Sequence, residues 1–266
     1  MTPEDGPARS AALWRFMVGY FDRYVRRHLN ALRLARWGVP AFAGHPGPIV
    51  VYCNHPAWWD AAVLILLGGH LFPARACYAP FEARMLEKYR IFGRIGAFGV
   101  ELESARGAAQ FLRAARRILS APDRMLWITA QGRFADVRAR PLDLRAGVAR
   151  LPEIAPDALF VSLALEYAFW EERGGEAFAA FGTPVRGADL LALDRPARLA
   201  RMEADLTATL DALSADVMSR DASRFTSLAS GAKGIGGVYD LWRRLRAALA
   251  GRRFEPAHRQ GGDPVP

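Results

Sequence analysis

Residues 48–60 read PIVVYCNHPAWWD, and this stretch decides which class of fold the sequence predicts. The apolar run at 48–53 has no polar alternation, which is typical of a strand buried on both faces of a sheet. Asn54, His55 and Pro56 then predict a corner, with Pro56 at the first position of an apolar helix that carries Asp60. A strand that turns directly into a helix is the building unit of an α/β sheet.

The same alternation of strand and helix patterns continues along the chain. Further strand-like runs are predicted at 75–79, 96–102, 124–129, 159–165 and 177–182. Ser104 is a candidate N-cap for a helix over 105–119, and a proline near 196 opens a long helix with an apolar core stripe. The sequence therefore predicts a single α/β domain, with a mostly parallel or mixed sheet covered by helices on both faces.

Composition limits the classes of protein to consider. The chain has 266 residues, of which 52% are hydrophobic, so a large core is expected. No apolar run reaches the roughly 18 residues that a membrane-spanning helix needs, and no segment resembles a secretory signal. Cys53 and Cys77 lie in apolar runs and predict no disulfide scaffold, which favours a reducing compartment. The protein is expected to be soluble or peripheral to a membrane.

The N-terminal segment has a different pattern from the rest. One helix is predicted over about 11–37, with arginines on one face and aromatic and aliphatic residues on the other. Such a helix fits a membrane interface, and it fits equally well a surface helix packed on the domain. The predicted division is a membrane-associating helix in 1–40, an α/β domain in 41–254 and a flexible tail in 255–266. The basic stretch 241–253 allows the same two interpretations as the N-terminal helix. The glycine-rich segment 231–237 is interpreted as a flexible connection.

The formal net charge of +9 suggests an anionic partner, although abundant arginine can equally follow from a GC-rich genome. A membrane surface, a nucleic acid or a phosphorylated or CoA-like substrate would each fit. Because no nucleic-acid motif is present and the basic helix is amphipathic, an anionic membrane surface is favoured and no nucleic acid is expected. The remaining histidines show no metal-ligand spacing, so no metal is predicted.

The corner at 54–60 holds the candidate chemistry. A histidine can act as a general base near neutral pH when a partner fixes its tautomer, and a carboxylate is suited to that role. His55 and Asp60 are five positions apart, so one face of a regular helix cannot hold both. A corner with Asp60 bent back toward His55 removes this objection. The alternative is a structural histidine, which is the commoner reading of a lone histidine in an apolar context.

The string Asn54-His55, four residues, Asp60 resembles the N-H-x4-D signature of the glycerolipid acyltransferases, which include the lysophosphatidate and lysophospholipid acyltransferases. The resemblance covers about 40–185. It implies that His55 deprotonates an acceptor hydroxyl, that Asp60 orients His55, and that the oxygen attacks the thioester of acyl-CoA or acyl-carrier protein. It implies no covalent acyl-enzyme and no cofactor besides the acyl donor.

Later blocks of the family are only partly matched. The family has Phe-Pro-Glu-Gly-Thr-Arg-Ser after an apolar strand, whereas this chain has Gln131-Gly132 in place of Glu-Gly. Glu101 stands roughly where an acceptor-binding arginine is expected, so lysophosphatidate is not implied as the acceptor. The backbone amides around Gly132 are candidates to stabilise an oxyanion. The predicted substrate-binding residues are Asn54, Trp58, Trp59, Gln131, Gly132 and Arg133.

These features together predict a peripheral O-acyltransferase at the cytoplasmic face of the cell membrane. It would move a fatty acyl group to a hydroxyl of a lipid-like acceptor such as a lysophospholipid or glycolipid. The alternative is a non-catalytic membrane- or lipid-binding module with the same fold. The acceptor, the acyl-chain length, the choice between the two donors and the oligomeric state are left open by the sequence.

Overall fold

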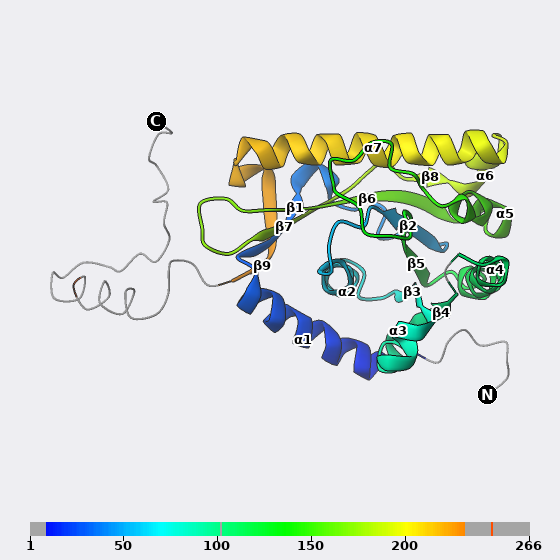
Figure 1. Cartoon of the computed structure of the whole chain (residues 1–266), viewed down its shortest axis with the longest axis horizontal. Helices are drawn as coiled ribbons and strands as arrows, with labels where there is room; N and C mark the ends of the chain where they lie inside the picture. Colours follow the sequence, from blue (N-terminus) through cyan, green and yellow to red (C-terminus); the bar gives the residue numbers. More distant parts are fainter. Residues whose placement is uncertain (1–8, 102, 232–245, 247–266) are drawn as a thin grey trace.

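The computed structural model describes residues 9–101, 103–231 and 246. In this part of the chain a nine-stranded sheet has the order β4-β3-β5-β2-β6-β7-β1-β9, and β8 pairs with β6 (Figure 1). The strands are β1 (Ala31–Ala35), β2 (Ile49–Cys53), β3 (Ala76–Glu82), β4 (Ala97–Val100), β5 (Arg124–Thr129), β6 (Leu159–Ala168), β7 (Glu176–Phe181), β8 (Val185–Arg186) and β9 (Phe225–Ser230). The helices are α1 (Ala11–His28), α2 (Asp60–Leu71), α3 (Ala83–Lys88), α4 (Ala105–Leu119), α5 (Leu151–Ile154), α6 (Gly187–Leu191) and α7 (Arg195–Ser219).

Strand β2 lies in the middle of the sheet, between β5 and β6, and is parallel to both. Cys53, its last residue, is in register with Thr129 of β5 and Leu163 of β6. All five of its residues are buried, which explains the unbroken apolar run in the sequence. The sheet is mixed, because β7 runs antiparallel to β6 and β9 antiparallel to β1.

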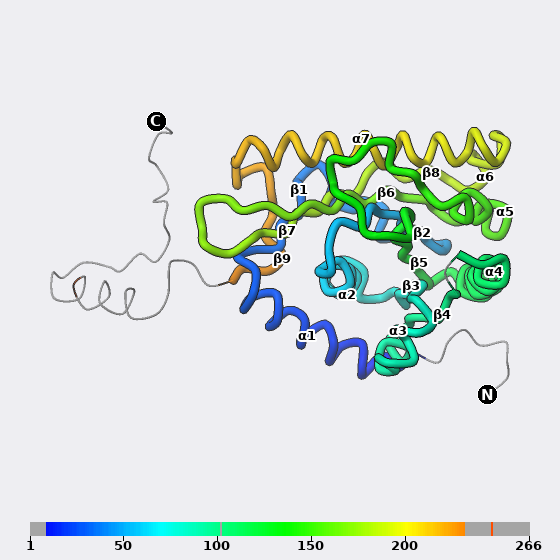
Figure 2. The backbone as a smooth tube through the Cα atoms, viewed as in Figure 1, coloured from blue at the N-terminus to red at the C-terminus, as the bar shows by residue number. Residues whose placement is uncertain are grey.

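Helices cover both faces of the sheet, as Figures 1 and 2 show. Helices α4, α5 and α7 pack over one face, and α1 and α2 pack over the other. Alternate residues of β2 supply the two cores: Val50 and Tyr52 face the α7 side, whereas Ile49, Val51 and Cys53 face the α2 side. The predicted single-domain α/β fold with helices on both faces is confirmed.

The prediction of one helix over 11–37 is wrong beyond His28. Helix α1 ends at His28, and the chain continues into β1, where Arg33 forms an ion pair with Glu176 of β7. Pairing with β7 and β9 overrides the helical spacing that the sequence shows here. Residues 31–35 are therefore part of the central sheet.

Two other helix predictions are confirmed. Ser104 caps α4, because its hydroxyl accepts a hydrogen bond from the amide of Gly107 at 2.9 Å. Asp194 caps α7 through the amide of Ala197, and the predicted apolar stripe of α7 packs in the core. Every strand predicted from an apolar run is present, and β1, β8 and β9 are additional.

None of the helices in the described residues is long and apolar enough to cross a membrane. The basic stretch 241–253, apart from Arg246, and the tail 255–266 lie outside the described residues. The same is true of the glycine-rich segment 231–237 after Gly231.

Candidate functional site

The chain leaves the middle of the sheet at Cys53 and enters α2 only at Asp60, through a turn (Figure 2). The predicted helix start at Pro56 is therefore four residues too early. The amide of Asp60 donates to the carbonyl of Ala57, and the amide of Ala57 donates to the Asp60 carboxylate, each at 3.2 Å. These two bonds close residues 57–60 as a turn ahead of the helix. The turn lies at the carboxyl end of the parallel strands, where α/β sheets bind their ligands.

The turn brings His55 and Asp60 into direct contact, as the corner in the sequence predicts. His55 Nδ1 lies 2.5 Å from Asp60 Oδ2. The Asp60 side chain is 1% exposed and the His55 side chain is 22% exposed. A carboxylate is an acceptor only, so neutral His55 carries its proton on Nδ1 and leaves Nε2 as an acceptor. The arrangement can therefore take a proton from a molecule bound beside Nε2.

Buried Asp60 has two further hydrogen-bond donors. The Tyr167 hydroxyl donates to Asp60 Oδ1 at 2.7 Å, and the Ala57 amide donates to Oδ2. Burial, together with the charge of Asp60 and the hydrogen bond to it, raises the pKa of Tyr167 well above its ordinary value. Tyr167 therefore stays protonated and can donate. Tyr167 lies two residues beyond the predicted strand 159–165 and is not among the predicted site residues.

Asn54 holds the corner against β6. Its side-chain amide donates to the carbonyl of Leu165, and its Oδ1 accepts from the amide of Leu165, each at 2.8 Å. The side chain thus extends the β2–β6 pairing beyond Cys53, which is in register with Leu163. Asn54 is buried and both of its polar atoms have partners within the protein. This placement does not support the predicted substrate contact and makes Asn54 a residue that fixes the corner.

Gln131 is also buried behind the corner rather than facing a substrate. Its Oε1 accepts from the backbone amide of His55 at 2.9 Å, and its Nε2 donates to the carbonyl of Leu142 at 2.9 Å. An amide side chain can accept at one end and donate at the other, whereas a carboxylate can only accept. Gln131 therefore joins the 130–142 loop to the backbone of His55. The predicted role, a contact with substrate, differs from this structural one.

We expect Gln131→Glu to destabilise the protein, although it makes this block more like the family signature. A buried carboxylate would face the Leu142 carbonyl without a donor, costing about 2–4 kcal/mol in the free energy of unfolding at about pH 8. Burial raises the pKa of the new carboxyl above its unfolded value of about 4.3. The variant is therefore most stable while this carboxyl is protonated, and its free energy of unfolding falls as pH rises through the folded pKa. The loss should thus be smaller at about pH 5.

Urea unfolding at the two pH values measures this effect. Gln110→Glu is the matched control, because Gln110 is only partly buried and, among the described residues, its side chain has one long hydrogen bond, with the amide of Glu101 at 3.4 Å. Equal stability of the two variants at both pH values would show that Gln131 does not hold the loop in this way.

Gly132 follows Gln131 in a left-handed conformation, with φ of 63°. Its amide donates to the carbonyl of Thr129 at 3.0 Å. Contrary to the prediction, this amide is therefore not free to bind an oxyanion. A β-carbon at this position would lie 3.1 Å from two side-chain atoms of Arg145. Both the backbone angle and this close approach favour glycine.

Arg133 lies at the surface, in an ion pair with Asp143 at 2.8 Å. Exposed ion pairs of this kind contribute at most about 1 kcal/mol, so an anionic ligand can compete for the guanidinium. The other arginines of this loop are paired in the same way. The pairs are Arg138 with Asp136, Arg140 with Asp211 and Arg145 with Glu103.

The Phe134 ring packs on His55, and the two tryptophans of the corner pack toward α1. The Phe134 ring lies 4.2 Å from the imidazole, centroid to centroid, and Phe134 is 61% exposed. Trp58 is 64% exposed, whereas Trp59 is partly buried and packs against Tyr24 of α1 at 5.5 Å. The two tryptophans differ in exposure, but their rings pack edge to face at 5.6 Å and both contact Tyr24. Phe134 is not among the predicted site residues, because no spacing rule places it on the histidine.

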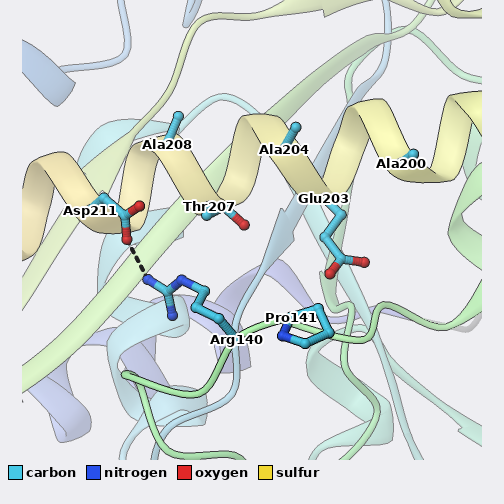
Figure 3. Close-up of a pocket in the computed structure, with 8 residues that line it drawn as sticks. All are labelled: Arg140, Pro141, Ala200, Glu203, Ala204, Thr207, Ala208 and Asp211. Atoms are coloured by element: carbon cyan, nitrogen blue, oxygen red, sulfur yellow. Dashed lines mark hydrogen bonds and ion pairs between the residues drawn. The ribbon is translucent and has the colours of Figure 1, made fainter.

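A groove between α7 and the loop that carries Arg140 and Pro141 offers a different kind of surface (Figure 3). Alanines of α7 line it, and at one end the Arg140–Asp211 ion pair, at 2.5 Å, joins the loop to α7. Neither His55 nor Asp60 lines it. The groove therefore adds no group to the chemistry of the corner.

The described residues contain no cluster of three or more histidine, cysteine or acidic residues that could hold a metal ion. A scan against protein-family models finds no family whose model matches this chain, and a search of curated proteins finds no similar one.

Proposed function

We propose that this protein is an O-acyltransferase that moves a fatty acyl group from acyl-CoA or acyl-carrier protein to a hydroxyl of a lipid-like acceptor. The observation that carries the proposal is the 2.5 Å contact between His55 Nδ1 and the buried Asp60 carboxylate, with the imidazole still partly exposed. The resemblance of 54–60 to the N-H-x4-D signature supports the same reaction.

In the proposed reaction His55 Nε2 takes the proton of the acceptor hydroxyl as its oxygen attacks the thioester carbonyl. Asp60 stabilises the imidazolium that forms, because its carboxylate already accepts from Nδ1. The tetrahedral intermediate then collapses, the carbon–sulfur bond breaks, and the leaving thiolate takes the proton from the imidazolium. An ester and a free thiol result, and His55 returns to its starting state.

The state of the two cysteines supports direct transfer without an acyl-enzyme on sulfur. Cys53 and Cys77 are both buried in the core beneath the sheet. Burial raises the pKa of Cys77 to about 11 and that of Cys53 well above its ordinary value. Because the thiolate is the nucleophilic form, neither cysteine is suited to attack a thioester.

Thiol release tests the proposal. Purified full-length protein is mixed with acyl-CoA or acyl-carrier protein thioesters and a polar lipid extract, and a thiol-reactive dye follows the reaction. We expect release that depends on added lipid. Protein that binds the lipid vesicles but releases no thiol from either donor would favour the non-catalytic lipid-binding module instead.

We further propose that the protein acts at the cytoplasmic face of the cell membrane, bound through α1 and the corner. Helix α1 buries Trp14, Met17, Phe21 and Val25 on the domain and exposes arginines and aromatic residues on its other side. The aromatic surface continues onto the corner, because the rings of Tyr24 and Trp58 lie 6.4 Å apart. Exposed rings among basic residues fit an anionic lipid surface.

We expect Trp58→Ala to weaken binding to vesicles of phosphatidylglycerol and phosphatidylcholine by about three- to tenfold, because one large ring is no longer buried in the interface. Vesicle sedimentation measures the change. Met218→Ala is the control, since Met218 is exposed on α7, across the sheet from α1. Equal loss in both variants, or none in Trp58→Ala, would place the membrane contact elsewhere.

A further inference from the structure

We infer that Tyr167 is a positioning residue that holds the Asp60 carboxylate in the orientation that fixes His55. The inference rests on the proposed function, and it adds a third side chain to the pair. The Tyr167 hydroxyl lies 2.7 Å from Asp60 Oδ1, the carboxylate oxygen that does not contact His55.

The length of β6 explains why Tyr167 reaches this carboxylate. β2 stops at Cys53, in register with Leu163, whereas β6 continues to Ala168. The overhanging part of β6 still pairs with β7 on its other side, which keeps it in place. Its first contact with the corner is the Leu165 backbone, which binds Asn54, and its second is the Tyr167 hydroxyl.

The two oxygens of Asp60 therefore have separate partners. Oδ2 faces His55 Nδ1 and the amide of Ala57, and Oδ1 faces Tyr167. Without the phenol, Oδ1 would be a buried acceptor with no partner in this arrangement. The carboxylate would then gain by turning toward another donor. Such a turn breaks the contact that keeps the proton on Nδ1 and leaves Nε2 open.

Tyr167→Phe tests the inference with two independent measurements. Nitrogen NMR of the imidazole ring, assigned with a His55→Gln sample, reports which ring nitrogen of His55 carries the proton. We expect one tautomer, protonated at Nδ1, in the wild type and a mixture in Tyr167→Phe. We also expect kcat for acyl transfer to fall about tenfold with KM unchanged, the rate equivalent of one hydrogen bond to a charged group.

Tyr78→Phe is the control, because Tyr78 is a core tyrosine that packs on the α7 side of the sheet. Both measurements should match the wild type in this variant. A single tautomer and an unchanged kcat in Tyr167→Phe would overturn the inference. The NMR result does not require acyl transfer, so it decides the role of Tyr167 even if the proposed reaction is wrong.

Lower stability of Tyr167→Phe could also reduce the rate, and a double-mutant comparison separates this cause from positioning. If Tyr167 acts through Asp60, adding Tyr167→Phe to Asp60→Asn should leave the residual kcat within about twofold. A further tenfold loss on the Asp60→Asn background would show that the effect of Tyr167 does not pass through the carboxylate, and would overturn the inference.

Discussion

Replacing His55 with glutamine is expected to lower kcat for acyl transfer by roughly 1,000-fold while the protein stays folded. General-base catalysis contributes about 100- to 10,000-fold, and glutamine cannot take up a proton near neutral pH. The His55 side chain is partly exposed at a turn and is not part of either core, so its loss should change the melting temperature little. Lipid-dependent thiol release and circular dichroism measure the two effects.

His70→Gln is the matched control for this experiment. His70 lies in the last turn of α2, with Nε2 3.7 Å from Asp22, and has no contact with the corner. Its variant should transfer at the wild-type rate. A near-normal rate of acyl transfer by His55→Gln would show that His55 is not the general base.

We expect Asp60→Asn to lower kcat by a similar or larger factor, roughly 1,000- to 10,000-fold. The reason is the tautomer. An asparagine has one acceptor oxygen where the carboxylate has two, so it cannot accept from Tyr167 on one side and from His55 and Ala57 on the other. With that oxygen toward Tyr167, it presents its amide group to His55 Nδ1. That donor forces the imidazole proton onto Nε2, where it blocks proton transfer from an acceptor. The asparagine also carries no charge to stabilise the imidazolium.

Pre-steady-state rates of ester formation and the same nitrogen NMR measurement test this prediction together. Asp189→Asn serves as the control, because Asp189 of α6 forms an exposed ion pair with Arg186 of β8. If Asp60→Asn keeps its rate within about threefold and His55 keeps its proton on Nδ1, the orienting role of Asp60 is contradicted.

The sequence predicts the strands of the buried middle of the sheet because their apolar runs are a local signal. PIVVYC becomes β2 with every residue of Ile49–Cys53 buried. β1 has no comparable signal, since ALRLA continues the spacing of the preceding helix and contains Arg33. Its place depends on partners in β7 and β9, which lie far along the chain. Pairing over such distances cannot be read from neighbouring residues.

The residues of the candidate site also differ in how far a local sequence pattern predicts them. His55 and Asp60 are close in sequence, so their contact follows from the local corner. The roles of Asn54 and Gln131 depend on which backbone groups the fold brings to them, and both side chains prove to be buried. Tyr167 is more than 100 residues from Asp60, and only the parallel register of β2 and β6 shows that the two meet.

The most direct test of the central claim is mass spectrometry of lipids extracted from a reaction with isotope-labelled palmitoyl thioesters of CoA and of acyl-carrier protein. The reaction contains the full chain and a polar lipid extract. We expect a lipid that has gained the labelled acyl group as an ester, one thiol released per ester formed, and no such product with His55→Gln. Folded wild-type protein that binds the vesicles and labels no lipid from either donor would contradict this claim.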